Sequence, residues 1–364
     1  MINTDNTDIQ EKKVAIRIYI IVPVFNSYEY LTECIESVLN EKTLDFRLVL
    51  IDDGSTDGSE KICDDYASID DRVVVIHQKN QGQIIARQVG TRYVLTQSCD
   101  KRRDIVMFLD SDDTFKQMTL SEVNKVMEDF SIDMMIFGMD RVINGKIIDS
   151  YKADGRYGGI IEEKRDLYKI VFNDWTYNPV CGKAIRVSLL ENNSYEEYGD
   201  VQYGEDLIQS IEYYKKSNRV FFYNESLYNY TINPNSMTQT INDKPYSVDF
   251  RVRQRVIEFL IQERVFDEQD WKQYRTFCMW LVADMLRTIC LLNVRLAEKV
   301  KLVKEMRFSE YYCMYLHNKE YNKLNDWWSY FSCLLFSRKQ FIVIAVMGSL
   351  YKKMREIRNK IRGY

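Results

Sequence analysis

The chain has 364 residues, of which 46% are hydrophobic and 29% are charged, so it can bury one large core or two smaller ones and is not a disordered polypeptide. Its net charge is −4, and its two histidines nearly exclude a histidine-rich zinc site, so any metal must be held by oxygen atoms. The eight cysteines include no C-x-x-C pair and follow no cleavable signal peptide, which predicts reduced thiols in a cytosolic protein.

Strand and helix patterns alternate through the first third of the chain, after a polar segment at residues 1–14 that is expected to be disordered. Pro23 is expected to end the first strand. Because each apolar run is followed by a polar turn and a helical pattern, the order predicts an open, mainly parallel sheet with helices on both faces. The predicted strands lie at residues 18–22, 48–51, 72–76 and 105–109.

Polar and acidic residues cluster where three of these strands end, at residues 23–26, 52–57 and 110–113. Ligands of such sheets bind beyond the carboxyl ends of the strands, so the three segments should meet in one cleft. The carboxylates of the last segment would repel one another unless a divalent cation or hydrogen-bond donors stabilised them. A solvated acidic turn that caps the next helix is the simpler alternative.

The middle of the chain is less regular. A helix is expected at residues 119–130, a strand at 133–137, and a hairpin at 139–150 that turns at Asn144-Gly145. An irregular stretch follows these elements and extends past residue 230.

A helix interrupts the irregular stretch and begins with Glu205 and Asp206, where helix capping is the simple explanation for the two acids. From about Val248 the chain has helical patterns with few turn signals. This predicts a separate α-helical extension over residues 248–364.

The end of the chain combines aromatic, apolar and basic segments. Residues 341–347 are an unbroken apolar run, too short to span a bilayer, and aromatic residues precede it. Residues 352–364 carry six Lys or Arg against one Glu. The segment therefore either lies on an anionic cytoplasmic membrane surface or is an ordinary packing helix with a solvated basic end, and the sequence leaves both open.

Several motifs in a fixed order resemble those of the family 2 glycosyltransferases, inverting enzymes of the GT-A fold, and in particular those that build bacterial capsular and exopolysaccharides. The resemblance covers about residues 15–240. The matching segments are IVPVFN at 21–26, IDDGSTD at 51–57, NQG at 80–82, ARQVG at 86–90, FLDSDD at 108–113, GEDL at 204–207, YNY at 228–230 and NS at 235–236.

The resemblance implies a GT-A domain at residues 15–247, with a nucleotide-binding half at 15–115 and an acceptor-side half at 116–247. The helical extension lies outside it. The residues implied to contact the nucleotide sugar are Pro23, Phe25, Asn26, Asp53, Gly82, Arg87, Asp110, Ser111 and Asp113.

The roles implied by the resemblance differ among these residues. Pro23, Phe25 and Asp53 would hold the nucleobase, and Arg87 would lie near the pyrophosphate or the ribose. Taken alone, Asp53 could only cap a helix and Arg87 could be a solvated surface charge.

The carboxylates have the remaining roles. Asp112 would bind Mn²⁺ or Mg²⁺, Asp110 would contact the ribose and could also contact the metal, and Asp113 would be a near neighbour of either. Asp206 matches the catalytic base of the family, with Glu205 beside it.

The chain departs from the family pattern at four points. Gln88 stands where an asparagine is usual, Gly182 replaces the asparagine often found before Lys183, and Thr231 stands where an arginine often follows. No proline follows Asp113 at the usual distance. The third departure puts in doubt how the donor phosphates are held.

The expected function is that of a metal-dependent, inverting glycosyltransferase. It would move a sugar from a nucleotide sugar to a hydroxyl of a glycan or lipid-linked oligosaccharide acceptor, and UDP-sugars are the commonest donors of the family it resembles. It would act at the cytoplasmic face of the plasma membrane, with no nucleic-acid partner, and self-association through the C-terminal helices is left open. The alternatives are a non-catalytic partner protein with the same fold and, less favoured, a nucleotidyltransferase.

Overall fold

The structure is a computed structural model, and the expected disorder of residues 1–14 lies outside the part of the chain that it describes. Side chains are not described for residues 245–251 and 352–362. The described residues are 16–42, 44–129, 131–152, 159–195, 204–233, 245–307, 324 and 326–362.

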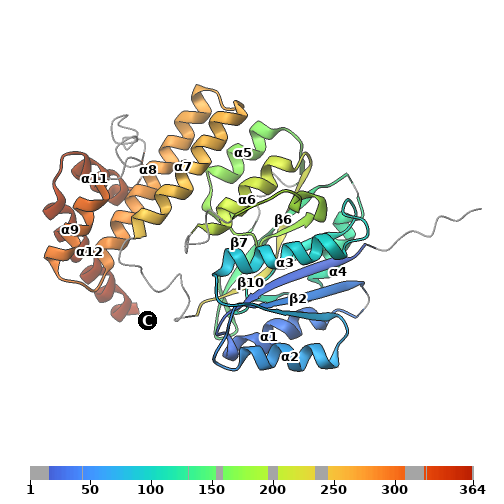
Figure 1. Cartoon of the computed structure of the whole chain (residues 1–364). Helices are drawn as coiled ribbons and strands as arrows, with labels where there is room; N and C mark the ends of the chain where they lie inside the picture. Colours follow the sequence, from blue (N-terminus) through green and yellow to red (C-terminus); the bar gives the residue numbers. More distant parts are fainter. Residues whose placement is uncertain are drawn as a thin grey trace, which may run out of the picture.

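The described strands form one ten-stranded sheet in the order β3-β2-β1-β4-β9-β6-β10-β5, with β7 beside β6 and β8 beside β10 (Figure 1). Their bounds are β1 Ile18–Val24, β2 Phe46–Asp52, β3 Val73–His77, β4 Ile105–Phe108, β5 Thr114–Phe115, β6 Met134–Ile143, β7 Lys146–Tyr151, β8 Gly159–Ile161, β9 Lys183–Arg186 and β10 Val220–Thr231.

Helices lie on both faces of the sheet, with α1 and α2 on one side and α3 on the other (Figure 1). The described α-helices are α1 Tyr28–Leu39, α2 Ser59–Ile69, α3 Gln83–Gln97, α4 Thr119–Met127, α5 Lys164–Phe172, α6 Glu205–Lys216, α7 Pro245–Glu263, α8 Glu268–Leu291, α9 Leu296–Arg307, α11 Trp327–Ser337 and α12 Phe341–Arg362. None of them is long and apolar enough to cross a membrane.

The predicted α/β sheet is confirmed, and its first half, β3-β2-β1-β4, is parallel throughout. Strand β9 runs antiparallel to both β4 and β6 and so joins this half to the parallel pair β6 and β10. Strands β8, β9 and β10 lie in the stretch that was expected to be irregular. That expectation was wrong because these strands pair with sequence-distant partners, which local patterns do not show.

Two local expectations have different outcomes. The hairpin of β6 and β7 turns at Asn144-Gly145 as predicted, with φ of 49° and 71° at the two residues, as a type I′ turn requires. Pro23 does not end β1, which continues to Val24. The proline is tolerated because β4 pairs with β1 only as far as Ile21, so Pro23 faces β2 alone.

The helical extension shares its hydrophobic core with the sheet domain. Its helix α7 packs on α6, where Val252 lies against Gly204, and the Phe259 ring packs 5.1 Å from that of Tyr168 on α5. On α8, Asp270 accepts a hydrogen bond of 2.6 Å from Arg165 of α5. Helices α9, α11 and α12 then pack on α8 and on one another (Figure 1).

Candidate active site

The carboxyl ends of β1, β2 and β4 meet at one edge of the sheet, as the sequence predicted. The loop after β1 is tied to the loop after β2, because Asn26 Oδ1 accepts a 2.9 Å hydrogen bond from the backbone N–H of Thr56. It is tied to the loop after β4 by the hydroxyl groups of Ser27 and Ser111, whose oxygens lie 2.6 Å apart. Beside this junction, the Phe25 side chain is exposed.

Asp53 is buried and organises the loop that leads into α3. One of its oxygens accepts hydrogen bonds from Gln78 Nε2 at 2.7 Å and from the Gln81 N–H at 2.8 Å, and the other accepts from the Gly82 N–H at 2.8 Å. Gly82 has a φ of 89°, which favours glycine. The carboxylate therefore holds the loop before α3 and does not cap α2, the helix that follows its own strand.

Arg87 is the centre of the site. Its guanidinium is fully buried, and Nη2 donates a 2.7 Å hydrogen bond to Asp110 Oδ1 while Nη1 donates to Asp206 Oδ1. Gln209, one turn further along α6, also accepts from Nη1 at 3.4 Å. The alternative of a solvated surface charge is wrong for this residue. Arg87 joins the acidic loop after β4 to the amino end of α6, two segments that are far apart in the sequence.

Burial raises the pKa values of Glu205, Asp206 and Asp112. Glu205 is shifted to about 8 by burial and by the neighbouring Asp206, and burial likewise raises the pKa of Asp206 while Arg87 opposes the shift. Burial and then Asp110 raise the pKa of Asp112 to about 6. These carboxylates are therefore better proton acceptors than free aspartate or glutamate, and they carry repulsion that a bound cation would relieve.

Asp113 differs from its neighbours because it is only 1% exposed. One of its oxygens accepts a 2.6 Å hydrogen bond from the Tyr228 hydroxyl, and the other accepts a 2.7 Å bond from the backbone N–H of Thr231. Both donors belong to β10. Asp113 thus fastens the acidic loop to β10, and its contact with substrate stays a prediction.

The donor set fits a metal that is shared with a substrate phosphate. Among the described residues, no group of three or more His, Cys, Asp or Glu side chains could hold a metal ion by itself. Mg²⁺ and similar hard cations are often bound by one or two carboxylates together with phosphate oxygens. Asp112 and Asp110 are carboxylates of the type that such a site uses, and their role as metal ligands stays a prediction.

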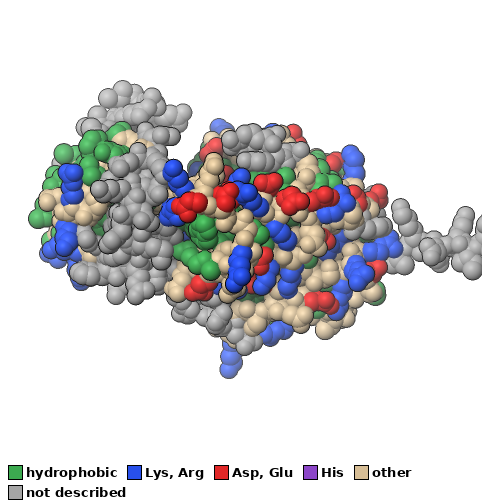
Figure 2. Space-filling view, turned by 90° about the horizontal axis from the view of Figure 1, so that it is seen from above, with side chains coloured by type: hydrophobic (Ala, Val, Ile, Leu, Met, Phe, Trp, Pro, Cys, Tyr) green, Lys and Arg blue, Asp and Glu red, His purple; other side chains and the backbone are tan. Residues whose placement is uncertain are grey.

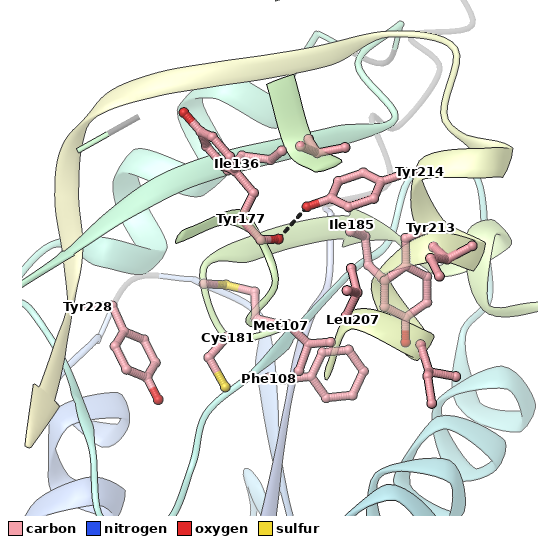
Figure 3. Packing of buried hydrophobic residues seen from close by; sticks show 14 of the residues in the cluster. Met107, Phe108, Ile136, Tyr177, Cys181, Ile185, Leu207, Tyr213, Tyr214 and Tyr228 are labelled. Carbon is pink, nitrogen blue, oxygen red and sulfur yellow. Dashed lines mark hydrogen bonds between the residues drawn. The ribbon is translucent and has the colours of Figure 1, made fainter. Parts of the chain in front are cut away.

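Further contacts were not anticipated from the sequence. Gln83 Nε2 donates a 2.8 Å hydrogen bond to Asp110 Oδ1, on the same oxygen that Arg87 contacts. Phe108 is the last residue of β4, and its ring stacks on that of Tyr213 of α6 with centroids 6.3 Å apart (Figure 3). Gln83 is the residue after the Asn-x-Gly motif, so its position was a usable signal, whereas the ring contact depends on packing alone.

Lys183 holds the segment that precedes β9 against α6. Its buried Nζ donates to the carbonyl oxygens of Tyr177, at 2.9 Å, and Pro179, and lies over the Tyr214 ring. The Tyr214 hydroxyl donates to the same Tyr177 carbonyl at 2.6 Å (Figure 3). Burial lowers the pKa of Lys183 to about 7. Gly182 fits because a Cβ there would lie 3.3 Å from the Phe137 carbonyl oxygen.

Comparisons with known proteins identify a family for the first half of the chain. Residues 19–192 match the family described as Glycosyl transferase family 2. The glycosyltransferase GlyG of Streptococcus pneumoniae is 24% identical over 64% of this chain and 76% of its own length, and the putative glycosyltransferase EpsH of Bacillus subtilis is 24% identical over 94% and 98%. The minor teichoic acid biosynthesis protein GgaA of B. subtilis is 38% identical over 29% of this chain and 23% of that protein.

Among solved structures, residues 1–349 of S. aureus TarS in complex with UDP-GlcNAc superpose with a TM-score of 0.63. The sequence identity is 17%, and the match covers 93% of this chain and 92% of that one. The likeness shows a common fold, which identifies the sheet domain as GT-A-like and extends into the C-terminal helices.

Proposed function

Residues 19–192 form a glycosyl transferase family 2 domain, and on this premise we propose that the chain is an inverting glycosyltransferase acting on a UDP-sugar. The observation that supports the proposal is the bridge from Asp110 through Arg87 to Asp206, in which one guanidinium donates to both the expected donor-side acid and the expected base. TarS in complex with UDP-GlcNAc supports UDP as the first nucleotide to test.

Asp206 is proposed as the general base. An acceptor hydroxyl is a poor nucleophile at neutral pH, and a carboxylate that takes its proton as the new bond forms typically accelerates such a step by ~10²–10⁴-fold. The raised pKa of Asp206 makes it a stronger proton acceptor, and Arg87 opposes the rise by favouring the carboxylate form. Glu205, with its pKa near 8, stays protonated at neutral pH and can hold the acceptor by a hydrogen bond.

The leaving diphosphate would be bound beside Asp110 and Asp112. A Mn²⁺ or Mg²⁺ ion bound there would stabilise the negative charge that the diphosphate gains. Phe25 and Asn26 lie at the open end of the loop after β1 and are proposed to contact the nucleobase side of the donor. The residues next to Asp53 are proposed to complete the nucleobase site. The carboxylate oxygens of Asp53 itself accept hydrogen bonds from the loop before α3.

A growing cell-envelope polysaccharide is the proposed acceptor, carried on a lipid at the cytoplasmic face of the membrane. The similarity to GgaA, named for teichoic acid biosynthesis, supports a polymer acceptor. The apolar and basic C-terminal segment supports a reaction at a membrane surface.

The test compares the wild-type chain with Asp206→Asn and Asp112→Asn, using UDP-, GDP- and dTDP-sugars with Mn²⁺ and following release of the nucleoside diphosphate. We expect turnover with one UDP-sugar and a loss of ~10²-fold or more in each variant. Asp166→Asn removes an exposed carboxylate in the first turn of α5 and serves as the matched control.

Wild-type rates in Asp206→Asn would contradict its role as base. If calorimetry showed that the wild-type chain binds UDP, while no donor was consumed in the presence of a full acceptor panel, the non-catalytic alternative would replace this proposal.

A further inference from the structure

Helix α12 presents apolar side chains to solvent along one side. Ile342, Val346 and Leu350 follow at four-residue spacing and share one face, and Ile342 and Leu350 are 63% and 57% exposed. Trp327 at the start of α11 is also half exposed, and its ring lies 6.2 Å from that of Tyr351 on α12. The exposed apolar residues of the two helices therefore adjoin.

The opposite side of α12 is fixed against α8. Ile344 and Ala345 are fully buried, and a Cβ on Gly348 would lie 2.1 Å from the Cβ of Cys290, so the helices approach as closely as glycine allows. Because this side is held by packing, α12 cannot rotate its outer residues inward. The sequence left open a membrane-surface segment and an ordinary packing helix. The exposed side of α12 suits the first alternative, and its buried side suits the second.

The apolar spacing continues in the sequence into the basic end of α12. Met354, Ile357 and Ile361 follow Leu350 at intervals of three or four residues, and residues 352–362 contain six Lys or Arg against one Glu. An apolar stripe on a helix rich in Lys and Arg is typical of helices that lie in the interface of an anionic membrane. Figure 2 shows hydrophobic side chains gathered at the outer end of the C-terminal helices.

We propose that this outer face of α11 and α12, defined by Trp327, Ile342, Val346 and Leu350, docks on an anionic lipid bilayer. The apolar side chains enter the headgroup boundary, and the basic end binds lipid phosphates. The bilayer is favoured over a protein partner because apolar exposure and positive charge occur together along one helix. The proposed function places the reaction at a membrane, and this inference names the surface that would contact it. The inference rests on the proposed function only for that location.

The experiment measures sedimentation of the full chain with vesicles of phosphatidylcholine alone or with added phosphatidylglycerol. We expect binding to the anionic vesicles that weakens as salt is raised. Ile342→Ser combined with Leu350→Ser should weaken this binding ~10-fold or more, and a chain ending at Tyr351 should lose the preference for anionic lipid.

The matched control is Ile147→Ser combined with Ile148→Ser, which removes two exposed isoleucines from β7 and should leave binding unchanged. Circular dichroism confirms that each variant is folded. The proposal is overturned if the wild-type chain stays in the supernatant, if the α12 variant binds like wild type, or if light scattering shows a wild-type dimer that this variant dissociates without any vesicle binding. Donor turnover is measured separately, so failure here leaves the transferase proposal standing, and the reverse also holds.

Discussion

At the scale of single residues, Arg87 determines the charge of the site. Burial of a guanidinium is costly unless anions face it, and here Asp110 and Asp206 both do. Burial alone would lower the pKa of Arg87, but Asp206 and Asp110 outweigh it and raise the pKa well above its usual value, so the guanidinium stays charged. In return it holds down the pKa of Asp206, which burial and Asp110 raise. Arg87 is thus a positioning residue for the proposed base.

We predict that Arg87→Met lowers kcat/KM on the order of 10²-fold and moves the acid limb of the pH–rate profile to higher pH. The base must be ionised, so activity falls as the pH drops through the pKa of Asp206. Loss of the positive charge raises that pKa, and the loss of activity therefore begins at a higher pH. The measurement is the pH dependence of kcat/KM for the donor that the wild type uses.

Arg92→Met is the control, since this exposed arginine lies on the same helix α3. A variant that loses activity equally at all pH values would argue for a purely structural role of Arg87. An unchanged profile with unchanged activity would remove Arg87 from the site.

At the scale of elements, the amino end of α6 is set by Gly204. This residue has a φ of 82°, and a Cβ there would lie 2.9 Å from Val252 Cγ2 of α7. The proposed acids Glu205 and Asp206 follow immediately. Helix α7 of the extension therefore contacts the turn that positions the proposed base. It contributes to the site although it is distant from the acidic loops in the sequence.

We predict that Gly204→Ala destabilises the chain by about 1–3 kcal/mol and also lowers turnover, because both the left-handed backbone and the contact with Val252 oppose a side chain. Gly145→Ala is the matched control, with a φ of 71° but no atom within 4 Å of the added Cβ. Urea unfolding of the two variants separates backbone strain from crowding. Equal destabilisation of the two, with turnover intact in both, would show that α7 does not constrain this turn.

At the scale of the whole molecule, one hydrophobic core runs from the sheet into the C-terminal helices. Polar contacts cross the same boundary, including Arg165 to Asp270 and a 3.0 Å ion pair between Arg255 of α7 and Glu212 of α6. Removal of the extension would expose apolar residues of α5 and α6. The two parts should therefore unfold together.

We predict a single cooperative unfolding transition. Four of the five tryptophans lie after residue 245, so in a Trp175→Phe variant the fluorescence reports on the extension alone. Its urea midpoint should coincide with that of loss of UDP binding measured at the same denaturant concentrations. Two separated midpoints would show that the extension unfolds independently, as the separate unit that the sequence predicted.

The sequence by itself determined the parts that depend on local patterns. Alternating apolar runs and polar turns predicted the α/β sheet, the Asn144-Gly145 hairpin and the edge at which the acidic loops meet. The motifs resembling family 2 glycosyltransferases predicted the family, which the comparison confirms for residues 19–192. The assignments of individual site residues, including the metal and the base, stay predictions.

Only the tertiary structure decided which partner each charged group has. Asp53 holds the loop before α3, Asp113 is turned to β10, and Arg87 is buried between Asp110 and Asp206, because strand pairing and helix packing bring together segments that are distant in the chain. The same packing raised the pKa values of Glu205 and Asp206. Local sequence fixes the type of each group, but burial and charge partners depend on long-range packing, which local sequence does not encode residue by residue.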